Sequence, residues 1–304
     1  MIEIQDVSKR HGDRWAVREL SCTVRPGRVT GFLGPNGSGK SSTLRMVVGL
    51  DSPTSGRVLV EGRRYAEHPA PLTRVGALLE ARGVHPGRSA RAHLQALAAT
   101  HRFSRRRVEE VLELVGLTEV AHRRSGGFSL GMGQRLGIAA ALLGDPATVL
   151  LDEPANGLDP DGVRWLRGLL RQLADEGRTV LVSSHLLAEM AGTADHVVVL
   201  GRGRLLADAP LAELLASGAR PAVRVRSPRA RELRDLLHGP GVVLGSPAED
   251  VLLVEGASAE QVGEVARAHG VPVHELVTEQ PSLEEAFAAL TGDAVEFDAG
   301  RVRR

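Results

Sequence analysis

Eight consecutive residues, GPNGSGKS from Gly34 to Ser41, have the types and the spacing of a phosphate-binding loop. In such a loop the glycines let main-chain N–H groups turn inward onto phosphate oxygens, the lysine (Lys40) reaches the β- and γ-phosphates, and the serine can hold Mg²⁺. The strand-like run RVTGFLG leads into the loop, and the helical run KSSTLRMVVGL, Lys40–Leu50, leads out of it. The predicted nucleotide contacts are Gly34, Pro35, Asn36, Gly37, Ser38, Gly39, Lys40, Ser41 and Ser42, and Ser41 is also a predicted metal ligand.

A second stretch, TVLLDEP from Thr148 to Pro154, is an apolar strand that ends in two carboxylates. At such a position Asp152 would hold Mg²⁺ through water, and Glu153 would polarise an attacking water molecule. An acidic pair at a strand end is common on protein surfaces when it stands alone. Beside a phosphate-binding loop, the pair instead favours nucleotide hydrolysis.

The two stretches, in this order, resemble those of the ATP-binding subunits of ABC transporters. In that family a signature segment, typically LSGGQ followed by xQR, opens a helix within a helical insertion. The matching residues here are FSLGM, Phe128–Met132, in which Ser129 and Gly131 match the family pattern whereas Leu130 and Met132 depart from it. The resemblance implies that Ser129 and the start of its helix complete the ATP pocket of a neighbouring subunit.

Further segments align with the family in the same order. NGLD, which ends at Asp159, resembles the D-loop, and SSH places His185 as the switch histidine near the γ-phosphate. The glutamine of the family's Q-loop falls at Glu80, whose carboxylate could still bind Mg²⁺ or order water. The aromatic residue that stacks on adenine falls at His11, with Trp15 as a substitute.

The order of apolar runs predicts an α/β fold. Strand-like runs at Thr148–Leu151, Thr179–Ser183 and His196–Leu200, with a helix starting near Asp159, indicate a parallel sheet. A mostly helical insertion is expected at about 86–143, with one helix over Val108–Leu117. The predicted P-loop NTPase core of ABC type, with its inserted helical subdomain, covers residues 1–218.

A smaller α+β domain is predicted at 219–292, followed by a flexible tail at 293–304. Its βαββαβ order matches the split, ferredoxin-like plan. The expected strands are Ala222–Arg226, Gly241–Leu244, Val251–Glu255 and Val271–Val277, and the expected helices are Arg229–Leu237, Ala259–Ala268 and Ser282–Leu290.

Bulk properties narrow the functional classes. The chain has 304 residues, of which 42% are hydrophobic, which suits two domains. A net charge of +1 gives no basic field that would favour nucleic acid as a partner. Cys22 is the only cysteine, and no apolar run approaches the length of about 20 residues that a membrane span requires. A cytoplasmic protein without an internal disulfide is therefore expected.

The resemblance implies a homodimer that hydrolyses ATP with Mg²⁺ and drives a separately encoded membrane-spanning permease from the cytoplasmic face. The relatives it resembles most, daunorubicin- and bacitracin-resistance exporters, imply export of a drug or of another small molecule or lipid. One alternative is a soluble ABC-type ATPase of DNA repair, chromosome maintenance or translation, but the interval between loop and signature is only about 90 residues and lacks heptads. Another is a non-catalytic regulatory module, against which Glu153 and His185 argue.

Overall fold

The computed structural model describes residues 1–80, 83–217 and 222–279, which form two compact units. The first unit ends at Leu211 and the second begins at Ala212. In the first unit the strands are β1 Ile2–His11, β2 Arg14–Val24, β3 Arg28–Leu33, β4 Ser55–Val60, β5 Val75–Leu78, β6 Thr148–Leu151, β7 Thr179–Ser184, β8 His196–Gly201 and β9 Arg204–Pro210. The helices are α1 Lys40–Val47, α2 Pro71–Arg74, α3 Ala90–Thr100, α4 Arg105–Leu114, α5 Leu130–Leu142, α6 Pro160–Asp175 and α7 Leu187–Met190, and α8 Leu211–Ser217 runs across the boundary.

A six-stranded sheet forms the centre of the first unit, in the order β5-β6-β7-β3-β8-β9. The first five strands are parallel, and β9 pairs antiparallel with β8 at the edge. Every residue of β6, β7 and β8 is buried, as expected for parallel strands that are covered on both faces. The predicted parallel sheet is confirmed, and it brings the carboxyl ends of β3, β6 and β7 to one edge.

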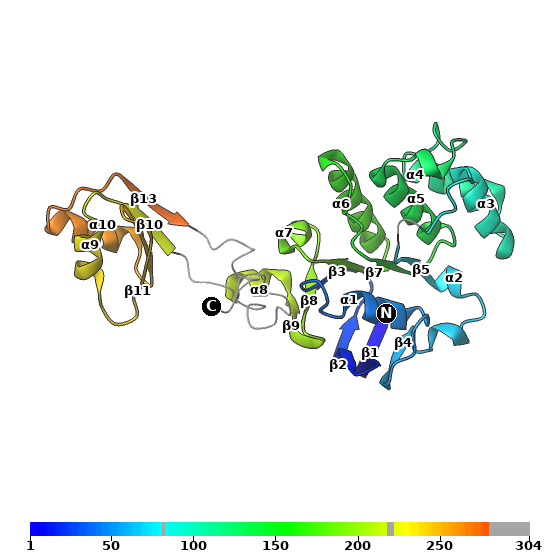
Figure 1. The fold of residues 1–304 in the computed structure, drawn as a ribbon, viewed down its shortest axis with the longest axis horizontal. Coiled ribbons are helices and arrows are strands. Elements are labelled where there is room, and N and C mark those ends of the chain that lie inside the picture. Colours follow the sequence, from blue (N-terminus) through cyan, green and yellow to red (C-terminus); the bar gives the residue numbers. More distant parts are fainter. Residues whose placement is uncertain (81–82, 218–221, 280–304) are drawn as a thin grey trace. The chain divides into compact units, whose positions relative to one another are not determined.

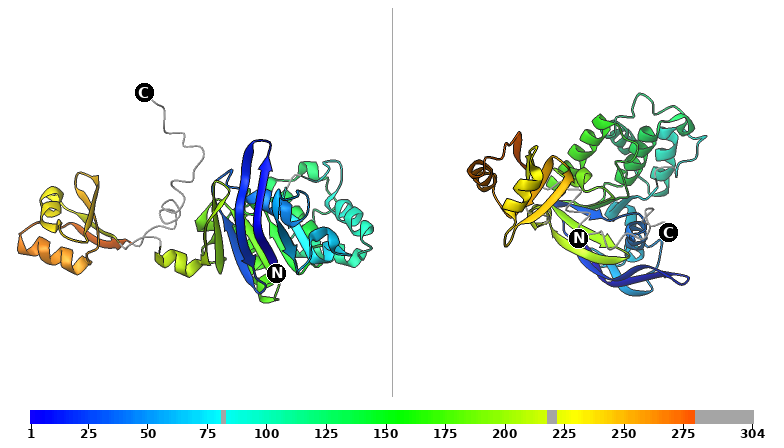
Figure 2. Two further views of the ribbon diagram at one scale, coloured as in Figure 1. Left: turned by 90° about the horizontal axis from the view of Figure 1, so that it is seen from below. Right: turned by 60° about the vertical axis from the view of Figure 1, so that its left-hand side comes forward.

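The two faces of this sheet are covered by different elements. Figure 1 shows α5 and α6 on one side, with α1 and the antiparallel sheet β2-β1-β4 on the other. The long β1–β2 hairpin stands out in dark blue in Figure 2. One apolar core joins α1 to both sheets, with Leu44 and Val47 of the helix packed among residues such as Phe32, Leu181 and Val60. This packing fixes the start of α1 at the end of β3.

The helical insertion is present as α3, α4 and α5, within the predicted interval. Two predicted helix ends are wrong by a few residues. The helix expected to reach Leu117 ends at Leu114, and the helix expected to reach Leu50 ends at Val47. In both cases a glycine follows in the left-handed region, Gly116 with φ 70° and Gly49 with φ 69°. A residue in that region ends a right-handed helix, and glycine adopts it readily because it has no Cβ.

The second unit is a ferredoxin-like α+β domain, as predicted. Its elements are β10 Ala222–Arg226, α9 Ala230–Leu237, β11 Val243–Ala248, β12 Val251–Glu255, α10 Ala259–Ala268 and β13 Glu275–Glu279. The strands form one antiparallel sheet in the order β11-β12-β10-β13. Alternate residues of the two central strands, among them Val225 and Leu252, face α9 and α10 and form the core of this unit with them.

Two strands of this unit begin later than the sequence suggested. The strand expected from Val271 begins at Glu275, because the Val271 N–H still bonds to Ala266 of α10 and Pro272 has no N–H to contribute to a ladder. The strand expected from Gly241 begins at Val243, because Gly241 has a φ of 82° and lies in the preceding turn. The predicted helix Ser282–Leu290 and the tail 293–304 lie outside the described residues.

Candidate nucleotide-binding site

The loop between β3 and α1 is shaped by close main-chain packing. Gly39, the residue before the helix, has a φ of 104°, and a Cβ there would lie 2.5 Å from the Ala16 carbonyl oxygen. A Cβ on Gly34 would lie 2.4 Å from the Leu200 carbonyl oxygen. Side chains are therefore excluded at both glycines. The loop leads directly into the first turn of α1, where free N–H groups and the helix dipole favour an anion.

Lys40 is the first residue of α1, and only 6% of it is exposed. Its Nζ donates hydrogen bonds to the carbonyl oxygens of Gly34 at 2.6 Å and of Pro35 at 3.3 Å. It also lies 3.6 Å from Oε1 of Glu153. Burial lowers the pKa of Lys40, while the charges of Glu153 and Asp152 act in the opposite direction. The ammonium group thus lies inside the loop, close to the acidic pair.

The acidic pair follows β6, and β7 carries the residues that hold it in place. Because β6 and β7 are parallel neighbours, their carboxyl ends meet. The Ser183 hydroxyl donates to Oδ1 of Asp152 and accepts the Glu153 N–H at 2.9 Å. His185 Nδ1 lies 2.8 Å from Oε2 of Glu153. The structure therefore brings Lys40, Glu153 and His185 together, and Ser183 is a site residue that the sequence reasoning missed.

A cleft of about 390 Å³ joins the predicted nucleotide contacts to Glu153. Its lining includes the two aromatic candidates, His11 at the end of β1 and Trp15 in β2. Trp15 is 36% exposed, and the guanidinium groups of Arg10 and Arg18 lie 5.8 and 5.5 Å from the centroid of its ring. The other lining residues are Arg14, Ala16, Asn36, Gly37, Ser38, Gly39, Lys40, Ser41 and Ser42.

Glu80 lies two residues beyond β5 and is exposed. Its strand is the neighbour of β6, and the Asp152 N–H bonds to the Leu78 carbonyl at 2.7 Å, so Glu80 follows the same edge of the sheet. Within the residues that the structure describes, no three acidic, histidine or cysteine side chains are grouped closely enough to hold a metal ion. Magnesium commonly takes only one or two carboxylates and completes its shell with phosphate and water oxygens. Asp152 and the Ser41 hydroxyl are hard oxygen donors of that kind.

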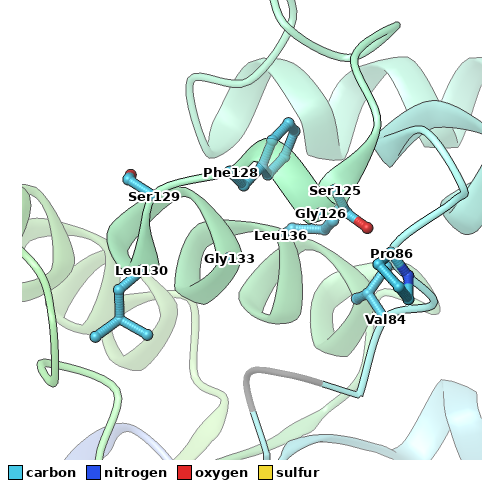
Figure 3. A pocket seen from close by; sticks show the side chains of 9 residues that line it. All are labelled: Val84, Pro86, Ser125, Gly126, Phe128, Ser129, Leu130, Gly133 and Leu136. Atoms are coloured by element: carbon cyan, nitrogen blue, oxygen red, sulfur yellow. The ribbon is translucent and has the colours of Figure 1, made fainter.

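The signature segment has the predicted local structure. Helix α5 begins at Leu130, and its N-cap Ser129 accepts the Met132 N–H at 3.2 Å. Ser129 is exposed, and 48% of Leu130 is exposed. Figure 3 shows both at the start of α5, where a pocket of about 400 Å³ lies between this helix and the segment that carries Val84 and Pro86. The remaining lining residues are Ser125, Gly126, Phe128, Gly133 and Leu136.

The predicted D-loop packs against the start of α5. Gly157 lies so close to Leu130 that a Cβ on Gly157 would be 2.2 Å from the leucine Cδ2. Asp159 caps α6 by accepting the Gly162 N–H at 2.8 Å, so its carboxylate already has a local structural role. The signature segment and the D-loop of one chain therefore form a single contiguous surface.

Parts of the sequence match known protein families, and the family that matches the first unit agrees with the site described above. Residues 17–156 match the ABC transporter family, and residues 221–284 match a domain of unknown function, DUF8746. The uncharacterised ABC transporter ATP-binding protein YdbJ of Bacillus subtilis (strain 168) is 32% identical over 297 residues, which cover 96% of this chain and 95% of that protein. This chain is an ATP-binding protein of the ABC transporter family. Its α/β core is accordingly that of an ABC ATPase, an enzyme that binds and hydrolyses ATP.

This ABC ATPase is also similar to a named transport protein and to solved structures of ABC transporter cassettes. The bacitracin transport ATP-binding protein BcrA of Bacillus licheniformis is 40% identical over 217 residues, which are 70% of this chain and 71% of the relative. The dimeric structure of MJ0796, a bacterial ABC transporter cassette, matches with a TM-score of 0.64 and 26% identity over 69% of this chain and 99% of that one. MJ0796 in a post-hydrolysis state with ADP and Pi matches with a TM-score of 0.63 and 25% identity, over the same shares of the two chains.

The described part of the chain contains no helix that is long and apolar enough to cross a membrane.

Proposed function

We propose that this ABC ATPase acts as a head-to-tail homodimer in which each ATP lies between the phosphate-binding loop of one chain and Ser129 of the other. The observation that carries this proposal is the separation of the two halves of the site. The cleft with Lys40 and Glu153 has no residue of α5 in its described lining, whereas Ser129 presents an exposed helix start elsewhere in the same chain. A second copy would supply the missing anion contact, and the likeness to a dimeric cassette supports that arrangement.

Each predicted site residue has a role in this arrangement. Lys40 and the N–H groups of the loop bind the β- and γ-phosphates, and Glu153 orients the attacking water. His185, 2.8 Å from Glu153, holds that carboxylate and faces the γ-phosphate side. Bound Mg²⁺ would neutralise phosphate charge, held by Ser41 and Asp152. The remaining proposed contacts with the partner's nucleotide are Leu130, Gly131 and Met132 beside Ser129, together with Asp159 of the D-loop.

The adenine end of the nucleotide would lie over His11 and Trp15. Both line the cleft, from β1 and β2, and both precede the phosphate-binding loop in the chain. An indole offers the larger π surface for stacking on a purine, whereas imidazole offers a smaller one. His11 and Trp15 together would therefore form the adenine contact.

The transported material is proposed from the relatives. Two of them are named for bacitracin transport and two for lantibiotic transport. We therefore infer that this ATPase powers export of a drug or of another small molecule or lipid through a separately encoded permease, at the cytoplasmic face of the membrane. Residues 1–218 would form the ATPase core and residues 219–292 an accessory domain. The alternative of a soluble ABC-type ATPase in DNA repair or translation is not favoured by these relatives, and no nucleic-acid partner is expected.

The dimer can be tested with a variant that binds ATP but turns it over slowly. Glu153→Gln with Mg²⁺ and ATP should elute from a size-exclusion column with light-scattering detection at twice the mass of one chain. With ADP it should elute at the mass of one chain, because the nucleotide without a γ-phosphate lacks the group that Ser129 contacts. A single-chain mass with ATP, in a variant shown to bind ATP, would contradict the proposed dimer.

The place of Glu80 leads to a separate prediction. If its carboxylate lies in the outer shell of the metal, Glu80→Gln removes a negative charge near Mg²⁺ and should shift the Mg²⁺ concentration for half-maximal ATPase activity. The affinity for ATP should change less, since the loop contacts remain. The measurement is a Mg²⁺ titration of ATPase activity, with Glu113→Gln on the exposed face of α4 as the matched control. An unchanged titration would place Glu80 outside the metal shell.

A further inference from the structure

Gln134 is a buried polar residue for which the family resemblance assigns no task. It lies on the second turn of α5, and only 3% of it is exposed. Its Nε2 donates a hydrogen bond to the main-chain carbonyl oxygen of Glu153 at 3.1 Å. A carbonyl oxygen can only accept, so this contact fixes the orientation of the amide. A buried amide that lost its partner would leave an unsatisfied polar group, which is costly.

The main chain at Glu153 has an uncommon conformation. Its φ is 48°, a left-handed conformation that a residue with a Cβ rarely adopts. The peptide units on either side are held from different elements. The Glu153 N–H bonds to the hydroxyl of Ser183 in β7, and its carbonyl accepts from Gln134 of α5 and from the Asn156 N–H.

This conformation aims the carboxylate. Oε2 of Glu153 lies 2.8 Å from His185 Nδ1, and Oε1 lies 3.6 Å from Lys40 Nζ. A rotation of the peptide at residue 153 would swing both oxygens away from these partners. Misplacement of a reacting group by about 1 Å can cost a large factor in rate. The donor on α5 is therefore positioned to affect catalysis without touching the nucleotide.

The same helix also contacts the far end of this turn. Leu130, at the start of α5, packs closely against Gly157, whose φ of 79° also favours glycine. Ser129, which opens the helix, is the residue proposed to contact the partner's nucleotide. One helix thus joins the signature serine, the D-loop and the carbonyl of Glu153 within one chain.

We propose that Gln134 is a positioning residue for Glu153, which fixes the main chain beneath the carboxylate and transmits movements of the signature helix to it. This inference rests on the proposed catalytic role of Glu153 and on the proposed contact of Ser129 with a second nucleotide. Through Gln134, the nucleotide that engages Ser129 in one site affects the carboxylate that serves the other site of the dimer.

Steady-state ATPase kinetics of three variants test this role. Gln134→Met keeps the approximate volume but removes the donor, so kcat should fall about tenfold, as expected for the loss of one hydrogen bond at a catalytic group. The KM for ATP should stay within a factor of about two, because no nucleotide contact is removed. Gln172→Met is the matched control, since the Gln172 side chain is exposed on α6 and bonds to Glu176 just beyond that helix, and it should retain wild-type activity.

Gln134→Glu supplies a readout that a purely structural role would not produce. An ionised carboxylate cannot donate to the Glu153 carbonyl, whereas its protonated form can, and burial favours the protonated form. Its kcat relative to wild type should therefore rise as the pH falls from about 8.5 to about 6. Division by the wild-type profile removes the pH dependence that the rest of the site contributes through Lys40, Asp152, Glu153 and His185. The relative kcat of Gln134→Met should not change with pH.

Each outcome decides the inference. Full activity in Gln134→Met, a rise in KM with unchanged kcat, or a pH-independent defect in Gln134→Glu would overturn it. If Gln134→Met does not fold, Gln134→Glu still decides, because its recovery at low pH is measured within one protein. Glu153→Gln distinguishes a failure of the proposed catalytic role of Glu153 from a failure of the proposed positioning role of Gln134. High turnover in that variant would contradict the catalytic role of Glu153, whereas loss of turnover there with normal Gln134 variants would contradict only the positioning role.

Discussion

Glu153→Gln should lower the turnover of ATP by about 10²–10⁴-fold, which is the range that positioned acid–base groups contribute. The amide keeps the shape of the side chain but has no charge with which to orient the attacking water. Glu153 lies 3.6 Å from Lys40 and 2.8 Å from His185, and the glutamine amide would place a neutral polar group next to the same two side chains. The measurement is phosphate release at saturating Mg²⁺ and ATP.

ATP binding by this variant should stay close to that of the wild type. None of the loop residues that would cradle the phosphates is altered. Glu264→Gln on α10 serves as a control with the same chemical change at an exposed position of the second unit. Turnover within threefold of wild type in Glu153→Gln would remove this residue from the catalytic role.

Lys40→Met should act earlier, on the binding of ATP. The ammonium group is only 6% exposed and is aimed into the phosphate-binding loop by its bonds to the carbonyls of Gly34 and Pro35. Methionine fills a similar volume but brings no charge to the phosphates. A hydrogen bond to a charged group contributes about 1.5–3 kcal/mol, so the Kd for ATP should rise about 10- to 150-fold. Equilibrium titration with a fluorescent ATP analogue measures this change.

The chain offers a natural control, because Lys9 is its other lysine. Lys9 donates to the Ser52 carbonyl at 2.8 Å and does not line the cleft. Lys9→Met should therefore leave ATP affinity unchanged. Equal affinity in Lys40→Met and Lys9→Met would show that Lys40 does not bind the nucleotide phosphates.

Local features of this site could be predicted from sequence because they depend on short spacings. The positions of glycine and lysine in GPNGSGKS determine a strand, a turn and a helix start, and the structure has all three. Ser129 likewise precedes α5 as its N-cap, as a serine before a helical run suggests. Strands β10 and β12 begin and end at the predicted residues.

Contacts between distant segments could not be predicted in this way. Ser183 bonds to Asp152 and Glu153 only because β6 and β7 are neighbours in the sheet, which sequence spacing does not reveal. Gln134 reaches the Glu153 carbonyl only because α5 packs beside that turn. Among the described residues, Glu80 is not part of any group of acidic, histidine or cysteine side chains that could hold a metal ion, so its role stays a prediction.

The central claim, a site shared between two chains, can be measured directly by mixing two inactive variants. At an ATP concentration near the wild-type Kd, Lys40→Met no longer fills its own phosphate-binding loop with ATP, and Ser129→Arg places a bulky side chain where the partner's nucleotide would contact the helix start. Each homodimer should be inactive, because both of its sites contain the defect. A mixed dimer contains one site with an intact loop from the Ser129→Arg chain and an intact signature from the Lys40→Met chain. An equimolar mixture should therefore regain up to about a quarter of wild-type ATPase activity, since half of the dimers are mixed and each has one intact site of two. A mixture no more active than the separate variants would contradict the shared site.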